Sequence, residues 1–240
     1  MPRKHHYSQH FLRSPRIAAE LIGHSNLRKN DVVYDLGAGS GVITSVLARR
    51  VGRVVAVELE PQALTKLTNN LGRLDNVEIV SADIRNFIPS DKVYKVFCNP
   101  PFAIISELIT KLVSLDNRPQ AIYLIAQKQL AYKLCPSHSR FTSALGNAIA
   151  PFYKARIRKP LHKTDFTPPP AVDTVLLELK LRPEPLLDYC EFENYHQFVL
   201  KSYSEIKKFR SLKLNLAGIS PESKPSELSP EQWVKLYKIS

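Results

Sequence analysis

The residues best suited to chemistry lie in the segment Cys98-Asn99-Pro100-Pro101-Phe102. The apolar residues 94–98 are typical of a short buried strand, and the apolar spacing over 103–113 is typical of a helix. Two prolines cannot continue the hydrogen bonds of a strand, and each favours extended geometry in the residue before it. We therefore expect Asn99 at the carboxyl end of a strand, with its amide facing a crevice.

This arrangement suits a planar base that carries an exocyclic amine. The Asn99 amide oxygen and the Pro100 carbonyl are both acceptors, and Pro101 has no N–H that could compete for them. The Phe102 ring can stack on the base. The alternative is a strand that ends in an ordinary Asn-Pro turn.

A glycine-rich turn, Gly-Ala-Gly-Ser-Gly at 37–41, lies between an apolar run at 32–36 and helical spacing at 42–50. A strand, a glycine turn and a helix form the first half of a nucleotide-binding βαβ unit. Glycines allow a tight turn and let backbone N–H groups approach a ligand. The G-x-G-x-G spacing differs from the G-x-G-x-x-G of dinucleotide enzymes, and a tight turn without a ligand is the alternative.

Two acidic residues follow the next two predicted strands. Glu58 ends the second strand, where a carboxylate can accept both hydroxyls of a ribose; Glu60 is the weaker candidate for this role. The alternative for Glu58 is a helix N-terminal charge, because Pro61 begins a helix. Asp83 follows the third strand and could accept from an adenine amine while Ile84 packs on the ring; an exposed loop acid is its alternative.

These candidate groups fall after successive predicted strands. In an open α/β sheet the carboxyl ends of parallel strands line one crevice, where ligands bind. A fifth strand at 121–126 and helices at 127–134 and 140–150 continue the alternation. The predicted fold class is therefore α/β with a parallel sheet.

The charge of the chain indicates a polyanionic partner. The 240 residues include 34 Lys and Arg and 22 Asp and Glu, a formal net charge of +12, with a pI of about 9.6. This excess favours nucleic acid or an anionic membrane surface. No apolar run approaches the ~20 residues of a membrane span, and the basic start leads into no signal core. Three widely spaced cysteines indicate reduced thiols, so we expect a cytoplasmic protein without a metal site.

After residue 150 the sequence becomes richer in basic residues and proline. A basic strand is predicted at 152–159, a stiff proline loop at 164–173 and a second strand at 174–181. The basic residues suit phosphate contact, although solvation of an edge strand is the alternative. Residues 182–240 have amphipathic helix patterns at 193–209 and 230–237. We therefore divide the chain into a catalytic domain, 1–181, which includes a basic N-terminal arm, and a small helical appendage, 182–240.

In chain order, these motifs resemble those of the rRNA adenine N6-methyltransferases, and the similarity covers about residues 7–181. The short helical end is more similar to the Erm-type 23S rRNA enzymes of erythromycin resistance than to the KsgA-type 16S rRNA dimethylases. The motifs that carry the resemblance are Gln9-His10-Phe11-Leu12, Asp35-Leu36-Gly37-Ala38-Gly39-Ser40-Gly41, Glu58, Asp83, Asn99-Pro100-Pro101-Phe102 and the loop Phe166-Thr167-Pro168-Pro169-Pro170-Ala171-Val172-Asp173.

The resemblance implies a Rossmann-like class I methyltransferase sheet with a small helical C-terminal domain, and S-adenosylmethionine as cofactor. It implies methyl transfer to N6 of an adenine in 23S rRNA by a monomer, which would confer macrolide-lincosamide-streptogramin B resistance. The catalytic residues would be Asn99, Pro100 and Phe102. The cofactor-binding residues would be His10, Leu12, Gly37, Gly39, Glu58, Asp83, Ile84 and Asn99.

The residues expected to contact RNA follow from the charge pattern. They are the basic residues of the N-terminal arm and of the strand and loop after residue 150: Arg3, Lys4, Arg13, Arg16, Lys154, Arg156, Arg158, Lys159 and Lys163.

Two positions depart from the family pattern, which leaves alternative functions open. The family usually has Asn where His10 stands, and a single proline where Pro100 and Pro101 stand. The form N-P-P-F also occurs in DNA adenine methyltransferases. A KsgA-type 16S rRNA dimethylase is the first alternative. A DNA adenine methyltransferase and a non-catalytic nucleic-acid-binding factor on the same scaffold are the others.

Overall fold

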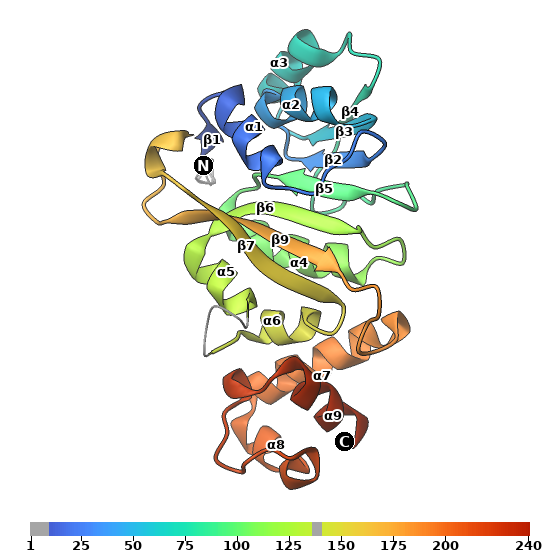
Figure 1. Cartoon of the computed structure of the whole chain (residues 1–240), viewed down its shortest axis with the longest axis vertical. Helices are drawn as coiled ribbons and strands as arrows, with labels where there is room; N and C mark the ends of the chain where they lie inside the picture. Colours follow the sequence, from blue (N-terminus) through green and yellow to red (C-terminus); the bar gives the residue numbers. More distant parts are fainter. Residues whose placement is uncertain (1–9, 136–140) are drawn as a thin grey trace, which may run out of the picture.

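The computed structural model describes residues 10–135 and 141–240. Arg3 and Lys4 therefore lie outside the described residues. The chain forms a seven-stranded sheet of order β4-β3-β2-β5-β6-β9-β7 (Figure 1). The strands are β2 (Val32–Leu36), β3 (Arg53–Glu58), β4 (Val77–Ser81), β5 (Lys95–Cys98), β6 (Ala121–Gln127), β7 (Tyr153–Leu161) and β9 (Thr174–Leu181).

Strand direction divides this sheet into two parts. Strands β4, β3, β2, β5 and β6 pair in parallel, whereas β9 pairs antiparallel with both β6 and β7. β2, β3, β5 and β6 are almost wholly buried, which is why their sequences are mostly apolar rather than alternating. The carboxyl ends of the five parallel strands meet along one edge of the sheet.

Helices cover both faces of the sheet. α1 (Pro15–Gly23) and α2 (Val42–Arg50) bury Leu21 and Leu47 in a core with Val54 and Tyr123. α4 (Ile105–Ser114), α5 (Lys128–Leu134) and α6 (Ala144–Ile149) form the larger core on the other face, as in Figure 1. α3 (Pro61–Leu71) packs on Ala56 at the β3 end. The α/β class expected from the sequence is thus confirmed.

A second, two-stranded sheet joins segments that lie far apart in the chain. β1 (Phe11–Leu12) pairs antiparallel with β8 (Phe166–Thr167), with Phe11 opposite Thr167. The Arg13 backbone N–H adds a bond of 2.9 Å to the Asp165 carbonyl. The pairing therefore fixes the start of the described chain against the proline loop.

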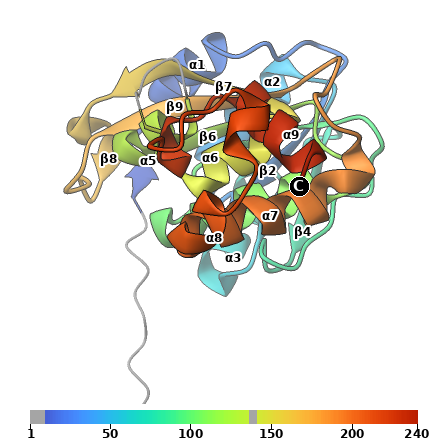
Figure 2. The ribbon, with the colours of Figure 1, turned by 90° about the horizontal axis from the view of Figure 1, so that it is seen from below.

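The last 50 residues form a helical unit at one end of the molecule. α7 (Phe192–Ser204), α8 (Ile206–Arg210) and α9 (Pro230–Lys238) lie below the sheet in Figure 1 and face the viewer in Figure 2. The Tyr195 hydroxyl donates to the Asn147 carbonyl of α6 at 3.1 Å. One buried apolar cluster contains both Leu177 of β9 and Trp233 of α9, so this unit shares its core with the sheet.

Two helices differ from their predicted bounds. The helix expected over 193–209 is broken at Glu205, whose φ of −121° and ψ of 82° leave helical geometry. The break lets Phe209 reach the Trp233 ring, 5.9 Å away. The helix expected over 140–150 is the shorter α6; Ser143, whose side chain accepts from the Gly146 N–H, begins it.

Candidate functional site

The glycine turn between β2 and α2 has a backbone that other residues adopt only with strain. Gly37, Gly39 and Gly41 have φ values of 81°, 57° and 91°, in the left-handed region. A Cβ on Gly41 would lie 2.7 Å from the Leu71 side chain, so this glycine also lets α3 pack closely. A Cβ on Gly39 would approach the Phe11 ring at 3.4 Å, across the pocket that the turn lines.

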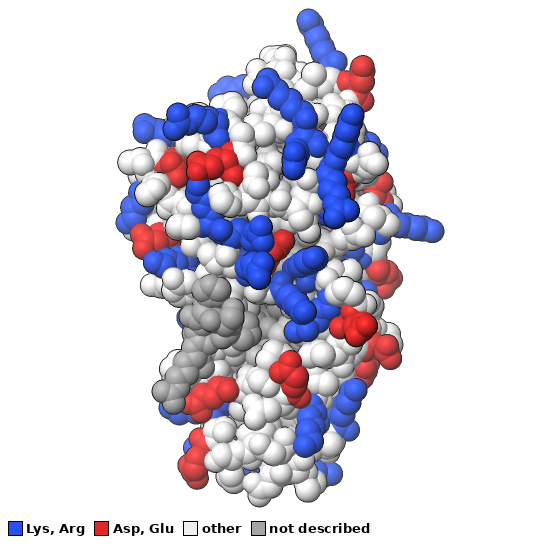
Figure 3. Space-filling view, in the orientation of Figure 1, with Lys and Arg blue, Asp and Glu red and all other residues white. Residues whose placement is uncertain are grey.

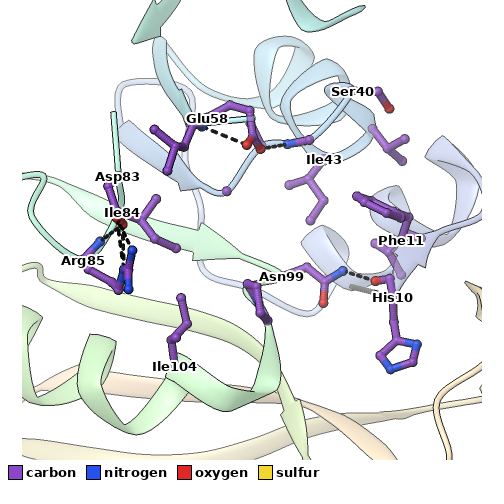
Figure 4. Close-up of a pocket in the computed structure, with 17 residues that line it drawn as sticks. His10, Phe11, Ser40, Ile43, Glu58, Asp83, Ile84, Arg85, Asn99 and Ile104 are labelled. Carbon is purple, nitrogen blue, oxygen red and sulfur yellow. Dashed lines mark hydrogen bonds and ion pairs between the residues drawn. The ribbon is translucent and has the colours of Figure 1, made fainter. Parts of the chain in front are cut away.

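The Glu58 carboxylate holds this turn from the end of β3. One of its oxygens accepts the Gly39 N–H at 2.7 Å, and the other accepts the N–H groups of Leu59 and Glu60 at 2.8 Å (Figure 4). Glu60 takes the role that was the alternative for Glu58, because its side chain accepts from two N–H groups at the start of α3. Glu58 is therefore positioned at the pocket rather than at the helix.

Asp83 lines the same pocket, after β4, with a partner that the sequence did not reveal. The Arg85 guanidinium contacts its carboxylate in a fork, at 2.5 to 3.1 Å, and the Arg85 backbone N–H donates at 2.9 Å. The hydrogen bond from Arg85 holds the pKa of Asp83 below its usual range. Asp83 is thus an ionised acceptor whose oxygens are shared with Arg85, and both residues line the pocket.

Asn99 lies where the sequence predicts it, immediately after β5 and at the pocket. Its Nδ2 donates to the His10 carbonyl at 2.7 Å. Because a carbonyl accepts only, this bond assigns the amide: Oδ1 is the oxygen left over. Figure 4 shows Asn99 reaching toward His10. Within residues 10–135 and 141–240, neither Asn99 Oδ1 nor the Pro100 carbonyl has a hydrogen-bond partner, so two acceptors are available side by side in the chain.

His10 connects three segments of the site. Its carbonyl holds Asn99, its Nδ1 donates to the Pro168 carbonyl at 2.8 Å, and its ring lies 5.4 Å from that of Phe102. In Figure 4 the His10 ring points away from the pocket, toward the side opposite Glu58. The His10 imidazole therefore contacts Pro168 and Phe102 outside the pocket, and the main chain of His10 is the part that contacts Asn99.

One pocket brings the candidate residues together. It lies at the carboxyl ends of the parallel strands and also includes side chains that sequence reasoning missed, among them Phe11, Arg85 and Ile104. Pro100 and Phe102 do not line it; Pro100 is buried and Phe102 lies against His10. All eight residues predicted to bind a cofactor line the pocket: His10, Leu12, Gly37, Gly39, Glu58, Asp83, Ile84 and Asn99.

Asp35 lies beneath the glycine turn and has an unusual environment. It is fully buried, and its carboxylate accepts from the Thr44 hydroxyl in the first turn of α2 at 2.6 Å. Its second oxygen has no partner among the described residues. Burial, with a smaller contribution from the nearby Glu58 charge, raises the pKa of Asp35 to about 7. Asp35 thus anchors the start of α2 at a cost in desolvation.

The cations predicted to contact RNA divide into two groups. Some are held within the protein: Arg13 donates to the Thr167 hydroxyl, Lys163 to the Ala171 carbonyl, Arg158 to the His24 carbonyl, and Lys159 pairs with Glu20. Three are exposed and form no side-chain hydrogen bond or ion pair in the described part of the chain: Arg16, Lys154 and Arg156.

Two further findings concern metals and membranes. No group of three or more His, Cys, Asp or Glu side chains within residues 10–135 and 141–240 is arranged to hold a metal ion. None of the helices that the structure describes is long and apolar enough to cross a membrane.

The fold is that of the Rossmann-like methyltransferases. The crystal structure of the 23S rRNA methyltransferase ErmE superposes with a TM-score of 0.80, covering 95% of this chain and 98% of that chain at 24% identity. A dimethyladenosine transferase from Plasmodium falciparum gives a TM-score of 0.71, covering 95% and 96% at 20% identity. These likenesses include the helical end as well as the sheet.

The sequence relatives specify the family. The profile of the ribosomal RNA adenine dimethylases matches residues 2–235. The ribosomal RNA small subunit methyltransferase A of Thermotoga neapolitana is 27% identical over 98% of this chain and 91% of its own length. The dimethyladenosine transferase of Saccharomyces cerevisiae is 28% identical over 80% and 61%. The chain belongs to the ribosomal RNA adenine dimethylase family, which implies an S-adenosylmethionine-dependent enzyme.

Proposed function

We propose that this protein transfers methyl groups from S-adenosylmethionine to N6 of an adenine in ribosomal RNA. The observation that carries the proposal is the pair of free acceptors, Asn99 Oδ1 and the Pro100 carbonyl, beside a pocket built on a glycine turn. An exocyclic amine presents two hydrogens, which match these two acceptors.

The residues of the pocket fit an adenosine-containing cofactor. Glu58 lies at the end of β3 with a fixed carboxylate for ribose hydroxyls, and Asp83 with Ile84 can receive the adenine amine and ring. Gly37 and Gly39 leave space that a Cβ would reduce. When bound, S-adenosylmethionine supplies a methyl group that its sulfonium charge already makes electrophilic, so the protein needs no nucleophilic side chain.

The work of the protein is to position and polarise the amine. The lone pair of an adenine amine is delocalised into the ring, which makes it a poor nucleophile. Hydrogen bonds from its two hydrogens to Asn99 Oδ1 and the Pro100 carbonyl favour a more tetrahedral nitrogen and orient its lone pair. The His10 carbonyl keeps the Asn99 amide in the orientation that presents Oδ1. Phe102 would stack on the extruded base, a contact worth roughly 1–3 kcal/mol.

For the RNA we propose 23S rRNA, methylated once or twice by a monomer in the cytoplasm, with macrolide-lincosamide-streptogramin B resistance as the consequence. The fold likeness to the 23S rRNA methyltransferase ErmE, which covers 95% of this chain, supports this choice. A small-subunit rRNA substrate is the second candidate, because the relative in Thermotoga neapolitana carries that name.

The test compares rRNA from cells with and without the gene by mass spectrometry of 23S and 16S fragments. We expect N6-methyladenine or N6,N6-dimethyladenine in 23S rRNA only when the gene is present, together with lower macrolide susceptibility. Purified protein with labelled cofactor is then offered naked 23S rRNA and immature 30S particles. Label in the 30S particles alone would transfer the assignment to the small subunit, and label in neither RNA would reject the proposal.

A further inference from the structure

The sheet face that α1 and α2 cover continues onto β9 and β7, where it carries exposed cations. Lys154 and Arg156 on β7 and Lys180 on β9 point to solvent on this face. Figure 3 shows Lys and Arg side chains gathered over the part of the surface where Figure 1 places β7 and β9. We call Lys154, Arg156 and Lys180 the β7–β9 cation patch.

The register of the two strands places like charges directly opposite each other. Lys154 is the cross-strand partner of Lys180, an arrangement that destabilises a sheet. Arg156 lies opposite Glu178, but that carboxylate is already engaged by the Tyr123 hydroxyl at 2.7 Å and by Arg158 at 3.6 Å. Among the residues that the structure describes, no side chain forms an ion pair or hydrogen bond with any member of the patch.

Protection of a sheet edge does not explain the whole patch. Charged residues on an outermost strand prevent pairing with other chains, and this could account for Lys154 and Arg156 because β7 is the edge strand. Lys180 is on β9, which has a strand on each side, so its backbone has no open edge to protect. The repulsion between Lys154 and Lys180 therefore requires another reason, and a polyanionic ligand supplies one.

Two neighbouring cations on β7, unlike the patch members, have partners within the protein. An irregularity in β7 between Ile157 and Lys159 turns Arg158 and Lys159 toward α1, where they meet the His24 carbonyl and Glu20. These two cations stabilise the packing of α1 on the sheet. The patch members have no such internal role, so their charge is available to a partner.

We propose that the β7–β9 cation patch binds the phosphate backbone of a double-stranded RNA segment that flanks the target adenine. This inference rests on the proposed function. Single-stranded RNA sites combine cations with exposed aromatic rings, and neither β7 nor β9 exposes a large apolar or aromatic side chain. A flat cationic surface without rings suits helical RNA, which proteins recognise mainly through its shape, phosphates and 2′-hydroxyls.

The position of the patch sets the length of RNA required. Because β7 runs parallel to β6, its Leu161 end leads toward β8 and the pocket, and Lys154 lies at the other end. At 3.3 Å per residue, the strand separates the two ends by about 23 Å. An RNA whose stem ends close to the target adenine cannot reach the patch, whereas a longer stem can.

The test measures the salt dependence of binding to an RNA duplex of about 16 base pairs, the length that double-stranded RNA-binding domains cover. Lys154→Gln, Arg156→Gln and Lys180→Gln are combined in one variant of the full chain. We expect the slope of log affinity against log salt to fall by about 2 to 3, since each phosphate contact contributes about 0.7 to 0.9. Lys180→Gln alone should lower the slope by about one.

The control combines Arg49→Gln, Arg50→Gln and Lys66→Gln, which removes three exposed charges from α2 and α3. It should leave the slope close to that of the wild type. Equal slopes for the patch and control variants, with both folded by thermal melting, would overturn the proposal. An equal loss for single-stranded RNA would overturn its double-stranded part.

The two proposals fail in different ways. Methyl transfer to a short hairpin that ends near the target adenine should proceed in the patch variant as in the wild type, and transfer to a long stem should need more RNA. If the wild type transfers no methyl to any RNA while the slopes still differ, the proposed function fails and the patch stands. If the patch variant changes methyl transfer to short and long RNA equally, the proposed RNA-binding role of the patch is rejected and the proposed function is unaffected.

Discussion

At the scale of single residues, the Asn99 amide has two roles: Nδ2 anchors the side chain, and Oδ1 is available as an acceptor. Nδ2 is committed to the His10 carbonyl, so any change of the side chain alters either the anchor or the acceptor. Pro100 contributes its carbonyl through the backbone and cannot be tested by a side-chain change alone. Substitution of Asn99 is therefore the most direct test of the proposed mechanism.

We expect Asn99→Ala to reduce methyl transfer by roughly a hundredfold or more, the usual effect of removing one polar group that acts on the reacting centre. Cofactor affinity should stay within several-fold, because Glu58 and the glycine turn are unchanged. Single-turnover transfer and calorimetric titration with S-adenosylhomocysteine measure the two quantities. Asn99→Asp keeps an acceptor but turns an oxygen toward the His10 carbonyl, so it should also be inactive. Near-wild-type transfer in either variant contradicts the role.

Arg85 controls how freely Asp83 can accept from a ligand. In Arg85→Gln the carboxylate gains free lone pairs but its pKa rises, because the hydrogen bond that lowers it is lost. At neutral pH we expect S-adenosylhomocysteine to bind several-fold tighter, about the value of one hydrogen bond. As the pH falls, the variant should lose affinity at a higher pH than the wild type, since Asp83 takes up its proton earlier.

Titration calorimetry between about pH 3 and pH 7 checks this expectation, because this range includes the ordinary Asp pKa of 3.8 toward which the variant returns. Arg85→Lys is the matched control: it keeps the charge but lacks the fork that contacts both oxygens, so it should lie between the wild type and Arg85→Gln. Identical affinities at every pH in all three proteins would mean that Asp83 does not meet the ligand.

At the scale of elements, the buried Asp35 between β2 and α2 lowers the stability of the folded state by an amount that depends on pH. Burial raises the pKa of Asp35 to about 7, whereas in the unfolded chain it is near 3.8. The folded state therefore binds more protons than the unfolded state between these two values, and its stability falls as the pH rises through that range. Below about pH 4 both states are protonated, and the penalty disappears.

Asp35→Asn should remove this dependence. The free energy of unfolding of the wild type is expected to decrease from pH 5 to pH 8 by more than that of the variant, by an amount on the order of a few kcal/mol. Urea denaturation of the cofactor-free protein at both pH values measures the difference. Parallel pH profiles for the two proteins would show that Asp35 titrates normally.

Elements with a strong local signal could be predicted from the sequence, and contacts between distant segments could not. Residues 32–36, 42–50 and 174–181 form the expected strand, helix and strand. Largely apolar sequence marks the two strands, and helical spacing directly after the glycine turn marks the helix. Gly37, Asp83 and Asn99 could be placed because each follows a strand, whereas His10 and Leu12 were placed by the family resemblance alone.

What the sequence did not reveal depends on tertiary structure. β1 and β8 are two residues each, too short for any periodicity, and exist only because they pair. The contact of Arg85 with Asp83 depends on how the loop after β4 turns. The break at Glu205 arises because Phe209 packs on Trp233, a contact that no local pattern encodes.

At the scale of the whole molecule, the helical end and the sheet share one core. Trp233 is completely buried, and its indole N–H donates to the Pro225 carbonyl at 3.2 Å. Its ring stacks on Tyr203, whose hydroxyl accepts a hydrogen bond from Asn147 Nδ2 in α6. The division at residue 181 stays a prediction, and these contacts indicate that the first part depends on the second.

We expect Trp233→Ala to cost roughly 3–5 kcal/mol of unfolding free energy, the usual range for a buried tryptophan. A chain that ends at Leu181 should lose its cooperative unfolding transition, since Phe152 and its neighbours would be exposed to water. Trp233→Phe, which keeps most of the apolar surface, is the control and should lose much less. A sharp transition in the shortened chain would establish 1–181 as an independent unit.

The pairing of β1 with β8 has a kinetic consequence. Phe11 and Leu12 form part of the wall of the pocket, and the same two residues pair in the sheet with Thr167 and Phe166 at the start of the proline loop. A cofactor that contacts Phe11 should therefore also slow the motions of the proline loop.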